Sequence, residues 1–314
     1  MNSAQQNRIA AVAREVRMRA PMALATSYGA TVSGPDGGYA VPVDFARSVL
    51  MPSVGALLPY CRELPVTQGG SIALPLDVAT AYGSDGIVAA WEVEGALLTQ
   101  QKPNLNLSNF ILKKLIAMVP VTDELLDDSD ALAAFLPIAM QTAVTRKVND
   151  GIIAGLGAGR PLGILNSGSL ITVAKDGSQG AGTIVDANIA AMLDRSLTPD
   201  SSRWVCNPSI YSKIVGLASF DSATQRLAGL PIVTTDSCPA PGTPGDLILA
   251  DLDFYIVASK TPQLNGSMHI WFDQDVTAFR LSFRMDGMPM LGAPVTPPNA
   301  TANKSHIITV AVRA

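Results

Sequence analysis

An apolar ribbon at residues 71–91 sets the strongest limit on the fold. Residues 71–77 alternate apolar with small or polar side chains, as a β-strand does, and a polar tip follows at residues 81–86. A return strand is expected at residues 87–91, which predicts a long two-stranded arm. An isolated hairpin is marginally stable, and each exposed large apolar side chain forgoes roughly 1.5–3 kcal/mol of burial. A second copy of the protein is the expected cover, through the interface residues Ile72, Leu74, Leu76, Ile87, Trp91 and Glu94.

A long helix is predicted beside this arm. The acidic segment 122–130 offers two helix starts, with Thr122 and Ser129 as candidate N-caps and carboxylates in the first turn. An apolar helical period continues from Ser129 to about Gly155, which predicts a helix roughly 40 Å long. Pro137 lies inside it, so we expect either a bend there or a helix that begins after it. The residues assigned to the helix start are Thr122, Asp123, Glu124, Asp127, Asp128 and Ser129.

Composition indicates a protein that loses much of its surface to neighbours. Charged residues make up 15% of the 314 residues, against about 25% in typical soluble domains, and the mean hydropathy is +0.27. No apolar run is long enough for a membrane span, which argues against a membrane partner. The three cysteines are widely separated, so free buried thiols are expected rather than disulfides or a zinc site. The net charge of −4 argues against a dedicated nucleic-acid binder.

Catalytic and cofactor motifs give little support to an enzyme. The glycine-rich segment Gly155–Gly159 is similar to a dinucleotide-binding loop, but it follows a predicted helix, and Pro161 stands where the next helix should begin. A structural turn is therefore favoured over an α/β nucleotide-binding enzyme. The acidic run at 123–130 fits helix-start stabilisation better than a calcium loop, which needs a central glycine and a final glutamate. We expect no catalytic residue, no cofactor and no metal.

Several short strings occur in the order and at the spacing of a known family. They are Gly37–Pro42, Leu64–Gly69, Trp91–Gly95, Val121–Ser129, Gly157–Leu165, Asn207–Pro208 and Gly229–Ile232. With them the chain resembles the major capsid protein of tailed double-stranded-DNA bacteriophages, the Hong-Kong-ninety-seven type, over nearly its whole length from Gly37.

The resemblance implies an α+β fold of several parts. These are an N-terminal arm and lead-in (residues 1–63), an extended β-hairpin arm with flanking strands (64–119), a peripheral domain with a long spine helix (120–182 and 269–314) and an axial α/β domain (183–268). Residues 1–20 are expected to form an amphipathic helix. Its arginines contact DNA or a scaffold in one interpretation and are simply solvated in the other. The residues assigned to the N-terminal arm are Arg8, Arg14, Arg17, Arg19 and Tyr39.

The resemblance also implies the function. The expected protein is a non-enzymatic, self-assembling structural protein of the virion, whose hexamers and pentamers form an icosahedral viral head around phage double-stranded DNA. Implied partners are a portal protein at one vertex, a separate scaffolding protein, packaged DNA held non-specifically on the inner face, and decoration proteins. Assembly is expected in the bacterial host cytoplasm. An encapsulin-like nanocompartment that encloses a cargo enzyme is the alternative.

Covalent self-crosslinking is not expected. Some members of the resembled family join a hairpin lysine to an asparagine of the peripheral domain with help from a glutamate. Here Leu97, Leu98 and Thr99 lie around the lysine position, and Lys102 is the first lysine downstream. The strand Asp275–Met285 contains neither asparagine nor glutamate. Non-covalent contacts are therefore expected to hold the shell.

Overall fold

The computed structural model describes residues 55–77, 105–128, 130–177 and 179–313, and the single residues 87, 89, 91 and 102. The chain divides into two compact units, Met1–Arg47 and Ser48–Ala314, and every described residue belongs to the second. The expectations for residues 1–45, for the hairpin tip and for the capping role of Ser129 therefore lie outside the described residues. So do the assigned residues Arg8, Arg14, Arg17, Arg19, Tyr39 and Glu94.

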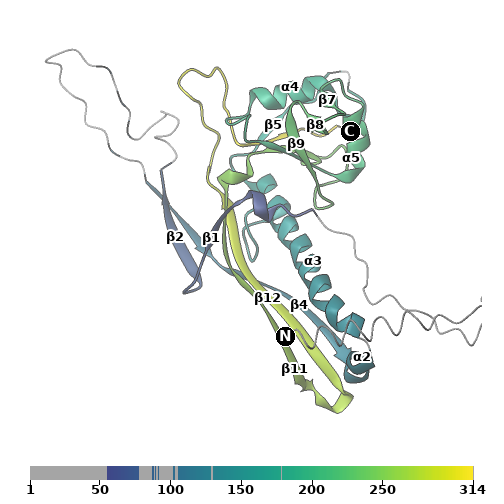
Figure 1. Cartoon of the computed structure of the whole chain (residues 1–314). Coiled ribbons are helices and arrows are strands. Elements are labelled where there is room, and N and C mark those ends of the chain that lie inside the picture. Colours follow the sequence, from purple (N-terminus) through teal and green to yellow (C-terminus); the bar gives the residue numbers. More distant parts are fainter. Residues whose placement is uncertain are drawn as a thin grey trace, which may run out of the picture. The chain divides into compact units, whose positions relative to one another are not determined.

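A long four-stranded sheet forms one part of the second unit (Figure 1). Its strands, in spatial order, are β1 (Arg62–Pro65), β11 (Tyr255–Trp271), β12 (Val276–Pro289) and β4 (Lys113–Thr122). Strand β11 joins residues 255–258 to residues 268–271 in one continuous strand. The joining residues 261–266 are exposed, so their polar character gave no strand signal in the sequence.

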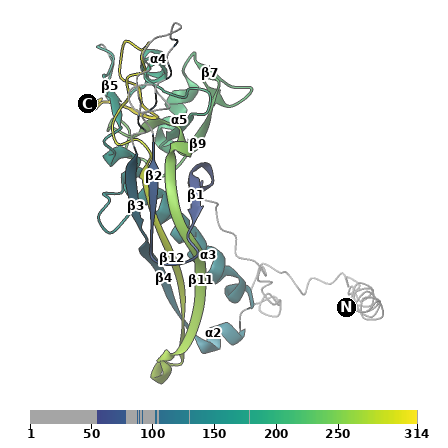
Figure 2. The same ribbon diagram turned by 90° about the vertical axis from the view of Figure 1, so that its left-hand side faces the viewer.

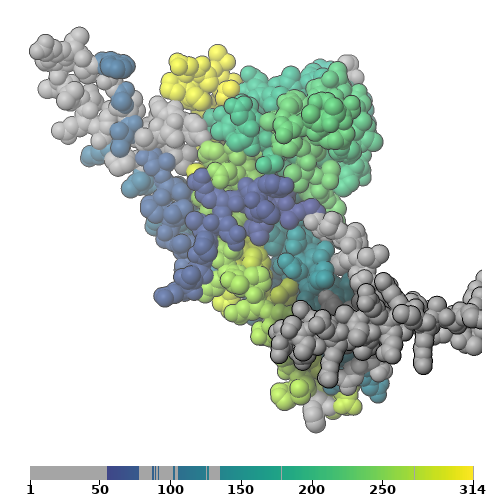
Figure 3. Space-filling view, viewed as in Figure 1, coloured from purple at the N-terminus to yellow at the C-terminus, as the bar shows by residue number. Residues whose placement is uncertain are grey.

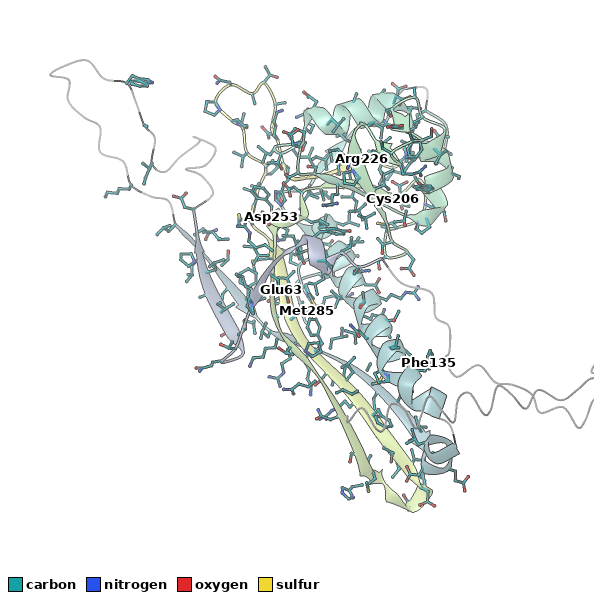
Figure 4. The ribbon with its side chains drawn as sticks, viewed as in Figure 1. Glu63, Phe135, Cys206, Arg226, Asp253 and Met285 are labelled. Atoms are coloured by element: carbon teal, nitrogen blue, oxygen red, sulfur yellow. The ribbon has the colours of Figure 1, made fainter. Side chains whose placement is uncertain are left out.

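Helix α3 (Asp130–Ala154) covers one face of this sheet, and the shorter α2 (Asp123–Asp128) precedes it (Figure 1). The 25 residues of α3 give a length of about 37 Å, as expected. The helix runs through Pro137, so it does not begin after the proline. Its buried residues Met140, Val144 and Val148 belong to the same core cluster as Phe283 of β12. Figure 4 labels Phe135 of α3 and Met285 of β12 in this layer.

A seven-stranded sheet with two helices forms the other part. Helix α5 begins at Pro208, which occupies its first turn, and the Asn207 side chain accepts a hydrogen bond from Ser209 N at 2.9 Å. Ile210 and Trp204 are fully buried in its core. The strands in order are β5 (Ile171–Val173), β13 (Ile307–Val310), β10 (Leu247–Ala250), β6 (Arg203–Cys206), β9 (Leu230–Thr234), β8 (Arg226–Leu227) and β7 (Phe220–Asp221), and the helices are α4 (Asp186–Asp194) and α5 (Pro208–Val215).

The strand pairing crosses the boundaries expected at residues 182 and 268. Strand β11 begins at Tyr255 and pairs with β12, whereas β5 and β13 pair with each other inside the seven-stranded sheet. The two parts also share a core cluster that contains Ile248 of β10 and Leu281 of β12. The division into peripheral and axial domains stays a prediction. Short 3-10 helices lie at η3 (Leu58–Tyr60), η5 (Ile164–Asn166), η6 (Leu252–Phe254) and η7 (Phe272–Gln274).

Candidate assembly interface

The hairpin arm has a different second strand from the one predicted. Strand β2 (Ser71–Leu76) pairs with β3 (Asn106–Ile111) in antiparallel register. Ile87 and Trp91, expected on the return strand, lie outside any strand and are 53% and 104% exposed. The prediction of a return strand at residues 87–91 is therefore wrong. The short alternation there matched the strand pattern equally well, and the sequence gives no direct measure of how far a hairpin reaches before it turns.

The inner face of the β2–β3 pair is covered by the chain itself (Figure 2). Ile72, Leu74 and Leu76 are half-buried and pack on a cluster that contains Phe110 and Ile256. In Figure 3 the purple atoms of residues 55–77 lie against the green atoms of β11. A second copy was expected to cover these three side chains. The chain itself covers part of each, and a second copy at the surface that stays exposed remains a prediction. The residues that cover them are far away in the chain, so no local sequence pattern predicts these contacts.

The outer face of the same pair remains apolar and exposed. Leu107 and Ile111 are 67% and 58% exposed, and Leu105 just before β3 is 62% exposed. These residues were missed in the sequence, although Leu105 and Leu107 alternate with asparagine as strand residues do. With Trp91 they make up the exposed apolar set of the arm. Exposed apolar surface that gathers into patches marks interaction sites in soluble proteins, so these residues are candidates for an interface.

The predicted helix start is organised around Asp123. Strand β4 ends at Thr122, α2 begins at Asp123, and α3 begins at Asp130, so both expected helix starts are present. The Asp123 carboxylate accepts a hydrogen bond from Thr277 Oγ1 of β12 at 2.6 Å, and its N–H donates to the Asp275 carbonyl at 3.0 Å. These contacts tie the helix to the sheet. Asp127 and Asp128 lie in α2, and Glu124 follows Asp123 in its first turn.

The glycine-rich segment after α3 is a structural turn, as predicted. An added Cβ on Gly155 would lie 2.1 Å from the Pro161 carbonyl oxygen, so only glycine fits this crossing. Leu162 N donates to the Gly287 carbonyl of β12 at 2.8 Å, and the Tyr255 hydroxyl donates to the Leu162 carbonyl at 2.9 Å. The segment follows a helix and packs on a sheet, and the N–H groups of Gly155, Gly157 and Gly163 donate to backbone carbonyls of the chain itself.

The three cysteine thiols are poor candidates for nucleophilic residues. Cys61, Cys206 and Cys238 are free and buried. Burial raises the pKa of the Cys61 and Cys206 thiols to about 12 and raises that of Cys238 as well, so the nucleophilic thiolate is suppressed. Within residues 55–77, 105–128, 130–177 and 179–313 no group of three His, Cys, Asp or Glu side chains is placed to hold a metal ion. No helix in the same described ranges is long and apolar enough to span a membrane.

A comparison with family models gives one match. The model described as "Phage capsid family" matches residues 37–299, which is most of the chain. No curated protein sequence matches.

Solved structures share the fold across nearly the whole chain. A chain of the capsid of an empty GTA particle has a TM-score of 0.69 at 19% identity, and the match covers 91% of this chain and 100% of that one. A chain from Gordonia phage Cozz has a TM-score of 0.58 at 12% identity, covering 94% and 98%. A chain from Microbacterium phage Oxtober96 has a TM-score of 0.62 at 16% identity, and the match covers 90% of this chain and 99% of that one. At such identities the similarity establishes the fold.

Proposed function

The chain belongs to the phage capsid family, and we propose that its copies assemble as hexamers and pentamers into an icosahedral head that encloses double-stranded DNA. As a member of that family it is a structural protein and no enzyme, and it self-assembles into capsomers. The observation that carries the finer proposal is the arm, whose apolar outer residues stay exposed on the folded chain. Trp91 is fully exposed, and Leu107 is two-thirds exposed. Burying these residues on a second copy would recover roughly 1.5–3 kcal/mol for each side chain.

The two parts of the fold are assigned to the two domains that such a subunit requires. We take α3 as the spine helix of a peripheral domain built on residues 120–182 and 269–314, and residues 183–268 as the axial domain. Strand pairing favours one adjustment, which moves β11 to the peripheral domain and moves β5 and β13 to the axial one. The chain then passes from the long sheet to the seven-stranded sheet, returns to the long sheet for β11 and β12, and ends in the seven-stranded sheet with β13.

We propose that the shell is held by non-covalent contacts. The sequence of β12 contains no asparagine and no glutamate, and Lys102 is the first lysine after the arm's tip. An isopeptide bond on the family's pattern therefore lacks its acceptor and its helper acid. Many interfaces of about 1,600 Å² each would then have to stabilise the particle together. Such interfaces also let misplaced subunits dissociate during assembly.

Further partners follow from the family and belong to the proposal. They are a portal protein at one vertex, a separate scaffolding protein, decoration proteins, and DNA held without sequence preference on the inner face, with assembly in the host cytoplasm. A net charge of −4 suits a wall that does not grip DNA along its whole length. DNA inside purified particles supports a head, whereas an enclosed cargo enzyme would instead support the encapsulin-like alternative.

Electron microscopy of the purified full-length chain tests this function. We expect rings or closed shells, with light scattering after size exclusion reporting masses of many subunits. Trp91→Ala should leave a folded, soluble subunit and abolish shells. Val215→Ala is the matched control, because Val215 is also exposed (45%) but lies on α5, away from the arm. A wild-type chain that stays monomeric at micromolar concentration, or Trp91→Ala shells of normal yield, would contradict the proposal.

A further inference from the structure

Two strands of the long sheet have an edge that is open to solvent. Among the described residues, no strand pairs with β4 on the side away from β12, and β1 pairs with β11 only as far as Ser259. In Figure 1, β4 and β11 lie on opposite sides of β12. An unpaired edge presents a row of backbone N–H and C=O groups, which is a template for pairing with another chain. A second copy could therefore extend the sheet at either edge.

Pro120 lies on the open edge of β4. Alternate residues of a strand bond to an antiparallel partner, and the residues between them point the other way. Just after β4, Asp123 N donates to the Asp275 carbonyl next to β12. Just before β4, Leu112 N donates away from β12, to the Gly70 carbonyl. The register of β4 with β12 is unbroken, so Pro120 points to the open edge, as Leu112 does.

Pro262 lies on the open edge of β11. Met290 N, just after β12, donates to the Phe254 carbonyl just before β11, so the even-numbered residues of β12 face β11. Gln263 is the register partner of Ser282. Gln263 therefore faces β12, and its neighbour Pro262 faces the open edge. A register shift immediately before Gln263 places a β-bulge at the same point of β11.

A proline in such a position blocks a neighbouring strand. Proline lacks the N–H that would bond to the added strand, and its ring occupies space beside the backbone. Both prolines are exposed, so neither is placed there by packing in the core. Lysines and bulges also discourage strand pairing at an edge. Here the exposed Lys114 accompanies Pro120 on β4, and the bulge accompanies Pro262 on β11.

We propose that Pro120 and Pro262 close the two edges of the long sheet against strand pairing with a second copy. The inference goes beyond the proposed function and does not depend on it. Strands β4 and β11 run parallel to each other, since each is antiparallel to β12. Pairing of the β4 edge of one copy with the β11 edge of the next would therefore repeat in one direction, and contacts of this kind form open filaments. The two prolines keep this route closed.

Threonine substitutions in the full-length protein test the proposal. Pro120→Thr supplies the missing N–H on a residue that favours strands. It should raise the equilibrium constant for pairing of two copies about tenfold, because one added backbone hydrogen bond corresponds to a factor of up to about ten. Pro262→Thr should have a smaller effect, since the bulge remains, and the double variant should form filaments in electron microscopy. Pro298→Thr is the matched control, because Pro298 is exposed in a turn and belongs to no strand.

Hydrogen exchange locates the contact. The amide groups of Ile116 and Met118 point to the same edge of β4 as Pro120, so in the wild type they should exchange as solvent-exposed amides do. In Pro120→Thr their exchange should slow as the protein concentration rises, whereas Pro298→Thr should behave as the wild type. Sedimentation velocity reports the size of the associated species, and thermal melting checks that each variant folds.

Two results would overturn the proposal. Slow exchange of the Ile116 and Met118 amides in the wild type would show that the edge of β4 is already paired. Folded single and double variants that sediment and exchange as the wild type does would show that the prolines block nothing. Pro262→Thr tests the second edge even if Pro120→Thr does not fold. Every comparison is made against the wild type, so a wild-type chain that forms no shells would contradict the capsid function alone.

Discussion

The seven-stranded sheet and the β2–β3 arm use apolar residues in opposite ways. In the seven-stranded sheet Trp204, Ile248 and Leu249 are fully buried, and the Trp204 indole donates to the Leu227 carbonyl at 3.0 Å. In the arm one face is half-buried on the chain's own sheet and the other stays exposed, as Leu107 shows. The apolar side chains of the seven-stranded sheet are buried within one chain, whereas those of the arm are partly buried on one face and exposed on the other. Mutations should therefore affect folding in the first region and assembly in the second.

The largest effect on folding is expected from the buried ion pair beside the ends of strands β10 and β13 in the seven-stranded sheet. Asp246 pairs with Arg313, and both side chains are fully buried. Asp246→Ala leaves the Arg313 charge without its partner and should lower the free energy of unfolding by about 3–5 kcal/mol. Urea denaturation measures this directly. A decrease in the free energy of unfolding below about 1 kcal/mol would mean that the ion pair contributes less to the folding of this region than its burial indicates.

A pH dependence of folding is expected from His306, which precedes β13. The ring is buried, neither nitrogen has a hydrogen-bond partner, and burial lowers its pKa from 6.5 to about 4. The unfolded chain therefore binds the proton more readily, so stability is complete above about pH 6.5 and falls as the pH drops towards 4, by about 3 kcal/mol in total. Denaturation at several pH values measures the slope. His306→Phe should remove the contribution of His306 to the pH dependence of the free energy of unfolding. An unchanged slope in this variant would show that another group causes the dependence.

A smaller effect is expected at the half-buried face of the arm. Leu74 packs on the cluster of Phe110 and Ile256, with part of its surface still in solvent. Leu74→Ala should cost roughly 1–2 kcal/mol of folding free energy, less than a fully buried leucine. The same denaturation experiment distinguishes the two faces. A loss of folding free energy equal to that of Leu249→Ala would show that Leu74 is buried within the chain as fully as a core leucine.

The smallest effect on folding is expected at the exposed face. Leu107→Ser should change the free energy of unfolding by less than about 0.5 kcal/mol, as exposed substitutions usually do. Particle yield in electron microscopy should nevertheless fall sharply, because Leu107 belongs to the surface that we assign to the neighbour. If folding weakens and assembly does not, the outer face is part of the subunit's own fold.

Local signals in the sequence predicted the elements that depend on neighbouring residues. The proline and asparagine at 207–208 start α5, the helical period defines α3, and apolar runs mark β6 and β10. Pairings between distant segments could not be predicted in this way. The partner of β2 lies beyond the arm's tip, and Asp246 meets Arg313 across 67 positions. The exposed middle of β11 is polar, so its continuity depends on pairing with β12 rather than on side-chain pattern.

The assembly interface stays a prediction, and the structure changes which residues are available for it. The alternation at residues 71–77 identified the arm, and Trp91 is exposed as an interface residue of the free subunit would be. Ile72, Leu74 and Leu76 were assigned to a neighbour because Phe110 and Ile256 are far away in the chain.

The turn after α3 has a mechanical consequence. Gly155 and Gly163 cross too closely for any other residue, and the backbone between them is bonded to β12 through Leu162 and Gly287. The C-terminal end of α3 is thus held by a hydrogen bond to β12, an interior strand of the four-stranded sheet. Moving the end of α3 away from β12 would therefore require breaking the hydrogen bond from Leu162 N to the Gly287 carbonyl.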